Sequence, residues 1–209
     1  MKILKICIPV LACLFIWAGC GKATDETSES PQTAYESFLT GDISLFDSAD
    51  IDTWGLDAWK DTILAYGGLE STYLDLDGDG VEELLVQYAD DPCSFNGVFH
   101  YDSGRLYCWQ FDCVENSCRD YPLRDGTMVR QYDYSGTCSY VLFHYQADGE
   151  TEELLNLFAR EELVYPDSTD PCPYYEVDGT EVDKAVFDEQ LNDMIINEIL
   201  DRSAWTSLP

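Results

Sequence analysis

Basic residues are scarce in this 209-residue chain, which has 11 lysines and arginines against 41 aspartates and glutamates, and only two histidines. Proteins bind nucleic acid and anionic lipid head groups through clustered lysine and arginine side chains, so the composition argues against both partners. Disorder is excluded as well, because disordered acidic chains lack the aromatic (13%) and apolar (45%) residues found here. We expect a folded, acidic protein that suits cations, with most carboxylates serving solubility alone.

Sequence signatures of catalysis are also missing. The chain has no Gly-x-Ser-x-Gly elbow, no His-Glu-x-x-His zinc helix and no phosphate-binding Gly-Lys-Ser/Thr loop. His100 and His144 fall in separate predicted strands, where we expect ordinary packed or surface residues. A carboxylate pair for glycoside hydrolysis stays open, because some pair among 41 acidic residues will have a workable separation. We therefore predict no catalytic residues.

No apolar run is long enough to span a bilayer comfortably, which takes about 20 residues, but the first run has the layout of a secretory signal. Lys2 and Lys5 precede an uncharged stretch that ends in Trp17-Ala18-Gly19-Cys20. A basic head, a short apolar body and small residues before a cleavage point are typical of exported proteins. A cysteine directly after Ala-Gly resembles the lipobox of bacterial lipoproteins. That resemblance implies lipidation of Cys20 and anchoring to the cell membrane on its extracytoplasmic side.

These features divide the chain into three parts: a signal peptide at 1–19, the lipidated cysteine and a flexible polar tether at 20–31, and one extracytoplasmic domain at 32–209. All 41 acidic residues and nine of the eleven basic ones follow Cys20, which gives the mature chain a net charge of about −32. Whether the anchor faces the outside of a single membrane or a periplasm stays open.

Six cysteines remain in the domain once Cys7 and Cys13 leave with the signal and Cys20 takes the lipid. An even number of cysteines in an exported chain favours disulfides, although six cysteines allow 15 pairings that the sequence does not resolve. Zinc binding and a reactive thiol stay as alternatives, but the close Cys-x-x-Cys pairs of zinc sites are missing. The disulfide candidates are Cys93, Cys108, Cys113, Cys118, Cys138 and Cys172.

Hydrophobic periodicity predicts helices at both ends of the domain and strands between them. The first predicted helix begins at Pro31. The other two span 57–66 and 183–200, and Asp183 is the expected N-cap of the last one. Residues 151–163 have helical propensity, yet we favour a strand there because they follow another strand across a turn. The other predicted strands are 72–75, 83–88, 97–101, 105–111, 128–133, 138–146 and 174–177. The predicted fold class is α+β, with N-terminal helices, an antiparallel β-sheet meander and a C-terminal helix.

One segment, Asp75-Leu76-Asp77-Gly78-Asp79-Gly80, carries a chemical pattern. Three carboxylates at alternate positions converge only if the backbone wraps around a point, and they repel one another without a cation. Gly80 permits the sharp turn, and calcium suits a set of six to eight oxygen ligands. The predicted ligands of a structural calcium ion are the side chains of Asp75, Asp77, Asp79 and Glu83 and the backbone carbonyl of Val81. An acidic turn without an ion is the alternative.

This loop resembles the Asp-x-Asp-x-Asp-Gly-x-x-Asp loop of integrin-type β-propeller repeats (the FG-GAP type), with Glu83 in the last position. An EF-hand fits badly, because its twelfth position should be Glu and is Val86 here. Together with the Tyr35-Glu36-Ser37-Phe38-Leu39 segment and the run from Tyr174 to Val182, the loop makes the chain similar to a group of uncharacterised Gram-positive lipoproteins. That resemblance implies no catalytic activity.

The expected function is therefore that of a lipid-anchored, calcium-stabilised binding or structural module outside the membrane, with a glycan or a protein as its unknown ligand. The alternative is a carbohydrate-binding or carbohydrate-active protein. Its basis is a cluster of aromatic side chains around one predicted hairpin, which are able to stack on sugars but which core packing also explains. They are Tyr101, Tyr107, Trp109 and Phe111.

Overall fold

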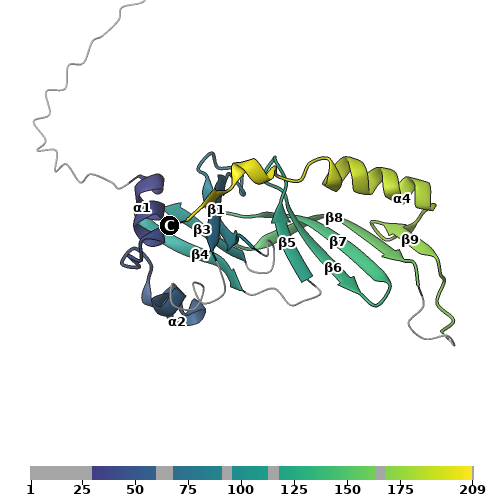
Figure 1. The fold of residues 1–209 in the computed structure, drawn as a ribbon, viewed down its shortest axis with the longest axis horizontal. Helices are drawn as coiled ribbons and strands as arrows, with labels where there is room; N and C mark the ends of the chain where they lie inside the picture. The colour runs from purple at the N-terminus through teal and green to yellow at the C-terminus, as the bar shows by residue number, and fades with distance from the viewer. Residues whose placement is uncertain (1–29, 60–67, 91–95, 113–117, 163–167, 209) are drawn as a thin grey trace, which may run out of the picture.

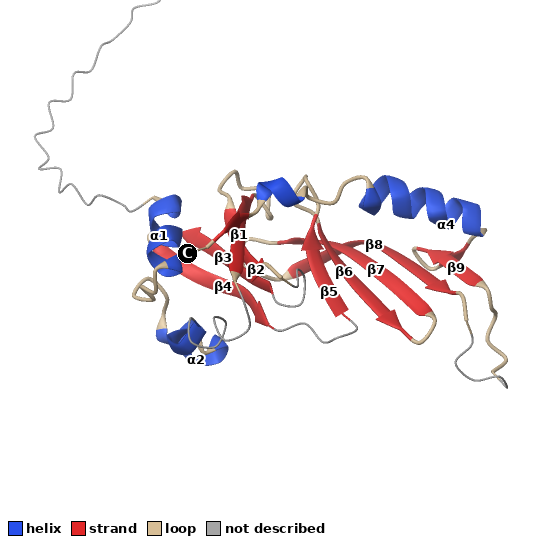
Figure 2. Ribbon diagram, viewed as in Figure 1, coloured by secondary structure: helices blue, strands red, loops and turns tan. Residues whose placement is uncertain are grey.

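The computed structural model describes residues 30–59, 68–90, 96–112, 118–162 and 168–208 (Figure 1). It contains two antiparallel sheets, with helices near both ends of the described chain (Figure 2). The predicted α+β class is confirmed. Two sheets form where we expected one meander. The first four strands pair with one another and with a short strand near the C-terminus (Thr206–Ser207), whereas the next six strands pair only among themselves in the described residues. Nothing in the described part of the chain forms a helix long and apolar enough to cross a membrane.

The first sheet has the strand order β11-β1-β2-β3-β4. Its strands are β1 (Leu69–Leu74), β2 (Glu83–Tyr88), β3 (Asn96–Asp102), β4 (Arg105–Asp112) and β11 (Thr206–Ser207). Ser103 and Gly104 both have positive φ between β3 and β4, as expected of a two-residue hairpin turn. The short β11 brings the end of the chain back to β1, where Glu70 pairs with Ser207.

The second sheet has the order β10-β9-β8-β7-β6-β5, so each strand lies beside its neighbour in sequence. Its strands are β5 (Cys118–Pro122), β6 (Met128–Tyr134), β7 (Thr137–Tyr145), β8 (Thr151–Arg160), β9 (Tyr174–Val177) and β10 (Thr180–Glu181). The strand that we favoured at 151–163 is confirmed, because β8 pairs with β7 along nearly its whole length. Pairing with two neighbours overrides the helical propensity of this segment.

Helices pack against both sheets. The N-terminal ones are α1 (Pro31–Leu39), α2 (Ser48–Trp54) and a 3₁₀ turn at Leu56–Ala58. Most of the helix predicted at 57–66 lies outside the described residues. The C-terminal α4 (Lys184–Leu191) follows Asp183, which sits at the N-cap as expected but makes no side-chain cap bond.

The predicted C-terminal helix is too long, because α4 changes at Asn192 into a π-helical turn, Asn192–Ile196. The side chain of Asn192 donates to the carbonyl of Asp188 at 2.6 Å, and such local bonds compete with regular helix geometry. A 3₁₀ turn, Arg202–Ala204, then leads into β11.

Three clusters of apolar side chains hold these layers together. One lies under α1 and packs Phe38 against Phe46, Trp59 and Phe99 with ring centroids 4.5–5.1 Å apart. A second joins α4 to the second sheet through Phe187 and neighbouring side chains. The third lies between the two sheets and contains Leu76, Leu85, Val98, Met128, Phe143 and Tyr145. The sheets therefore share buried apolar contacts.

Candidate metal centre

The aspartate-rich loop connects β1 to β2 and is wrapped around the carboxylate of Asp75. Oδ1 of Asp75 accepts a hydrogen bond from the amide of Gly78 at 2.8 Å, and Oδ2 accepts one from the amide of Gly80 at 3.1 Å. Both glycines have positive φ, 79° and 88°, a conformation that costs glycine nothing and other residues a good deal. The predicted wrapping of the loop is therefore present in the structure.

The side chains of the other two aspartates also accept hydrogen bonds from backbone amides of the loop. Oδ1 of Asp77 accepts from the amide of Asp79 at 3.0 Å, and Oδ1 of Asp79 accepts from the amide of Val81 at 2.6 Å. One carboxylate oxygen from each of Asp75, Asp77 and Asp79 lies within 4.8 Å of the others. Oxygens bound to one calcium ion at about 2.3–2.6 Å are at most roughly 5 Å apart. The three side chains thus fit one calcium ion; the contribution of the Val81 carbonyl stays a prediction.

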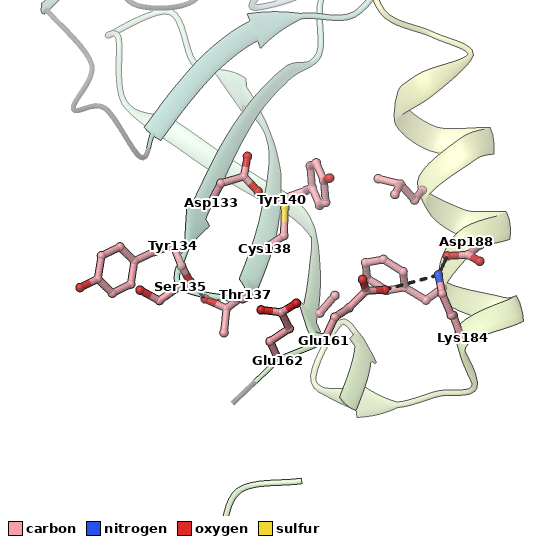
Figure 3. A pocket seen from close by; sticks show the side chains of 14 residues that line it. Asp133, Tyr134, Ser135, Thr137, Cys138, Tyr140, Glu161, Glu162, Lys184 and Asp188 are labelled. Atoms are coloured by element: carbon pink, nitrogen blue, oxygen red, sulfur yellow. Dashed lines mark hydrogen bonds and ion pairs between the residues drawn. The ribbon is translucent and has the colours of Figure 1, made fainter. Parts of the chain in front are cut away.

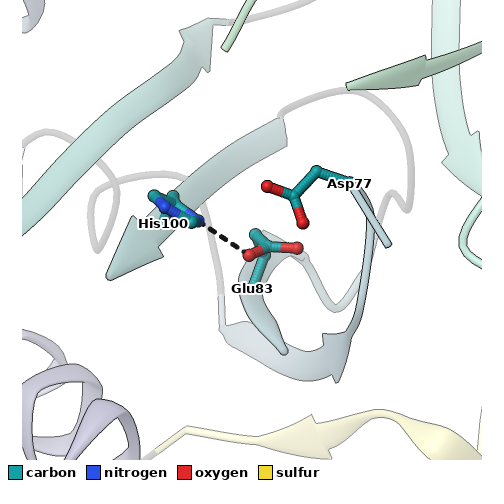
Figure 4. A group of neighbouring side chains, drawn as sticks. All are labelled: Asp77, Glu83 and His100. Atoms are coloured by element: carbon teal, nitrogen blue, oxygen red, sulfur yellow. Dashed lines mark hydrogen bonds and ion pairs between the residues drawn. The ribbon is translucent and has the colours of Figure 1, made fainter. Parts of the chain in front are cut away.

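Glu83, the first residue of β2, has a different set of neighbours from the one expected. Its side chain is fully buried, and Oε2 accepts a hydrogen bond from the amide of Leu76 at 2.7 Å. Oε1 lies 2.9 Å from Nδ1 of His100 (Figure 4). Glu83 therefore groups with Asp77 and His100, within 4.8 Å, while Asp75, Asp77 and Asp79 form a separate group. Its role as a calcium ligand stays a prediction.

His100 joins the site through the pairing of β2 with β3, where Leu84 lies opposite Phe99 and Glu83 is thus brought beside His100. The imidazole is 4% exposed, and its ring stacks on Trp109 with centroids 4.5 Å apart and an interplanar angle of 12°. We expected an ordinary strand histidine. Its contact with an acidic loop depends on the strand register, which the residue spacing does not reveal.

Burial and hydrogen bonding set the charges of the Glu83–His100 pair. Burial raises the pKa of the Glu83 carboxyl, although the bonds from His100 and the Leu76 amide oppose the shift. Burial lowers the pKa of His100, but the hydrogen bond and charge of Glu83 outweigh it, so the net pKa is raised. Because the pKa of each partner is raised, the buried Glu83–His100 pair favours retention of a proton.

The second carboxylate oxygen of Asp77 is the least satisfied atom of the centre. Oδ2 is buried and has no hydrogen-bond partner among the described residues. Figure 4 shows the Asp77 carboxylate facing that of Glu83. Buried carboxylate oxygens without a donor are rare, and binding of an ion is one way in which proteins satisfy them. Oδ2 of Asp77 is therefore the atom of this centre that a cation would satisfy.

A second concave site lies between the β6–β7 hairpin, the end of β8 and α4 (Figure 3). Its volume is about 550 Å³, and tyrosines, carboxylates and one lysine line it. Nζ of Lys184 lies 2.7 Å from Asp188 and 3.6 Å from Glu161. Its size suits a small organic ligand. Among the aromatic residues expected to stack on sugars, Tyr101 is buried, and Trp109 is partly buried against the apolar cluster between the sheets.

The cysteine predictions are reached only in part. Cys93 and Cys113 lie outside the described residues, as does Cys20, and no disulfide joins the cysteines that are described. Cys118 on β5 and Cys138 on β7 are separated by β6, and two strand spacings amount to about 9.6 Å. A disulfide needs Cα atoms within about 7 Å. Disulfide formation stays a prediction, but the strand spacing excludes a bond between Cys118 and Cys138.

No family model, curated protein or solved structure matches the chain. A functional conclusion therefore depends on the geometry of the two sites and on the features of the sequence.

Proposed function

We propose that this protein is a lipid-anchored extracytoplasmic module, a binding or structural protein whose fold is stabilised by calcium in the β1–β2 loop. The observation that carries the proposal is the convergence of Asp75, Asp77 and Asp79 within 4.8 Å in a wrapped loop. Three carboxylates and a backbone carbonyl are the hard oxygen ligands that calcium prefers. The signal-like N-terminus and the acidic charge support a location outside the cytoplasm, where calcium is abundant.

The bound ion would neutralise the repulsion among the aspartates and hold the loop in its wrapped form. Extracellular calcium modules have Kd values of about 10⁻⁴ to 10⁻³ M. At about 2 mM calcium, binding to the folded state alone contributes about 0.6–1.8 kcal/mol. For a domain of this length that energy raises Tm by about 1–7 °C.

The test is calorimetry of the chelator-treated protein, with and without added calcium, for wild type and for the Asp75→Asn/Asp79→Asn variant. Wild type should show the calcium-dependent rise in Tm, and the variant should not. Asp148→Asn/Glu152→Gln removes the same charge at the same spacing from a turn that we expect to bind no ion, and should behave as wild type. A wild-type Tm that calcium leaves unchanged would contradict the proposal.

The anchor is tested separately through Cys20. Metabolic labelling with a fatty acid should label the wild-type protein, and Cys20→Ala should remove both the label and the partition into detergent. An unlabelled protein that retains residues 1–19 would refute the location without affecting the calcium result.

Glycan binding is the second candidate function, and the groove in Figure 3 favours it because Tyr134 and Tyr140 line it beside several carboxylates. Aromatic rings with neighbouring hydrogen-bond acceptors are suited to sugar hydroxyls. Glycan-array binding that Tyr134→Ala abolishes would support this function. Tyr134 is 71% exposed, so the substitution should leave stability nearly unchanged.

A further inference from the structure

We propose that Asp77, Glu83 and His100 form a second cation site, adjacent to the calcium loop, that takes a divalent transition metal of the zinc type. The site goes beyond the calcium function, because its donor set includes an imidazole nitrogen. Each residue offers one ligand atom, and these atoms lie within 4.8 Å of one another.

The spacing of the donors suits a small metal ion. Nδ1 of His100 and Oε1 of Glu83 are 2.9 Å apart. Ligands about 2.0–2.2 Å from zinc, at angles between a right angle and the tetrahedral angle, lie roughly 2.8–3.6 Å apart. The separation of these two atoms therefore allows one zinc ion to bind both in place of the proton between them, and binding releases that proton.

Burial and charge also point to a cation. Glu83 is 0% exposed and His100 is 4% exposed, and Oδ2 of Asp77 is buried without a hydrogen-bond partner in the described structure. Two carboxylates facing each other in a low-dielectric environment repel strongly. A divalent ion would neutralise both and would give the Asp77 oxygen a partner.

The donor set favours zinc over calcium at this position. Calcium takes six to eight oxygen ligands, whereas imidazole suits zinc and other transition metals. Three protein ligands and a water are the usual complement of an open zinc site. The Leu76 amide already orients Glu83, and the stacked Trp109 ring orients His100, which is the role that outer-shell contacts have in known metal sites.

Asp77 is shared between the two groups. Its Oδ1 accepts from the Asp79 amide inside the calcium loop, and its Oδ2 is the unpartnered oxygen. Carboxylates bridge the metals in many two-metal sites. Asp75 belongs to the calcium group alone, and His100 to the second group alone, so single substitutions separate the two sites.

The experiment is calorimetric titration of the full chain with zinc chloride, in buffer that contains about 2 mM calcium. His100→Asn places an amide nitrogen near the position of Nδ1, so it keeps the bond to Glu83 but removes the imidazole ligand. It should lower zinc affinity by at least the roughly 100-fold that outer-shell changes can produce, and leave calcium affinity unchanged.

His144→Gln is the matched control, because His144 is not a member of the cluster. Its Nε2 lies 2.8 Å from the hydroxyl of Thr127. It should bind zinc as wild type does. Asp75→Asn/Asp79→Asn should lose calcium and keep zinc, so failure of the calcium proposal is distinguishable from failure of this one. A wild type that binds no zinc, or a His100→Asn variant that binds it equally well, would overturn the site.

X-ray absorption of the zinc-loaded wild type provides a second measurement should His100→Asn fail to fold. We expect a nitrogen and oxygen shell at about 2.0–2.2 Å with imidazole scattering. A sulfur shell at about 2.3 Å would place zinc on the cysteines, and an oxygen-only shell would place it in the aspartate loop. Either result would refute the proposed ligand set.

Discussion

Gly126, in the turn between β5 and β6, lies against the backbone of the metal loop at Asp75 and Leu76. Its φ is +89°, and a Cβ built there would overlap the carbonyl oxygen of Asp75 and lie 3.3 Å from the carbonyl carbon. Carbon atoms pack favourably at about 3.5–4.0 Å, so Gly126→Ala must move the Asp75 backbone. Gly179, with φ +75° and no atom within 4 Å of its built Cβ, is the matched control.

The two substitutions share the cost of backbone strain and differ in the cost of a steric clash. Both force alanine into a left-handed conformation, which costs about 1–2 kcal/mol, and both lose the same entropy of the unfolded chain. Only Gly126→Ala adds a steric clash, and overpacking of this kind costs about 1–3 kcal/mol. We therefore expect Gly126→Ala to be less stable than Gly179→Ala by about 1–3 kcal/mol, or roughly 2–12 °C in Tm.

Urea unfolding of the two variants at saturating calcium measures this difference, and calcium titration shows whether the loop has moved. Each 1.4 kcal/mol by which the displaced Asp75 backbone disfavours the bound form lowers calcium affinity tenfold. Gly179→Ala should bind calcium as wild type does. Equal stability losses in the two variants would refute the idea that the β5–β6 turn constrains the loop.

Three further predictions concern parts of the fold away from the loop. Phe38→Ala removes a fully buried ring that contacts three other rings, so calorimetry should show a loss of about 3–5 kcal/mol; a loss below 1 kcal/mol would contradict this core. Arg130→Met leaves the buried Asp120 carboxylate without its guanidinium partner at 2.6 Å. Because Arg130 is 36% exposed, we expect about 2–3 kcal/mol in urea unfolding, below the 3–5 kcal/mol of fully buried pairs, and a stability equal to wild type would argue against the pair. Peptide mapping under non-reducing conditions should find no Cys118–Cys138 bridge, and finding one would contradict the placement of β6 between them.

The elements that the sequence predicts well are those with a strong local pattern. β2 and the β3–β4 hairpin were predicted within a residue or so, because apolar runs and a Ser103-Gly104 turn mark them. α2 was missed although Asp47 caps its first turn and Gly55 ends it in a left-handed conformation. None of its seven residues is fully buried, and only Ile51 and Trp54 pack partly against the core, which is too little to form an apolar stripe that indicates a helix.

Short strands were missed for another reason. β10 and β11 have two residues each, too few for a period of two to be recognised. β5 has five residues, but one of its buried positions is the charged Asp120, so its apolar alternation is broken. Each forms because a longer strand offers an edge to pair with, and that edge exists only in the folded protein. The division into two sheets likewise depends on which edges remain unpaired after folding.

The metal centre shows the same limit at the level of single residues. The spacing of Asp75, Asp77 and Asp79 predicts their convergence, because a wrapped loop needs only local backbone geometry. His100 lies 17 residues from Glu83, and no local pattern connects them. An alternative register of β3 by one residue would turn the imidazole to the other face of the sheet, so only the observed pairing brings a nitrogen ligand to the carboxylates.

The position of the loop suggests that its cation stabilises more than the β1–β2 connection. Leu76 lies inside the loop, is 2% exposed and belongs to the apolar cluster between the two sheets. Its amide binds Glu83 from the same position, and the carbonyl of Asp75 touches the turn at Gly126. A cation that fixes Asp75 and Asp77 therefore fixes, through Leu76, a side chain packed against the second sheet. Since buried apolar contacts are lost when a packed side chain shifts, loss of the cation would loosen the junction between the sheets as well as the hairpin.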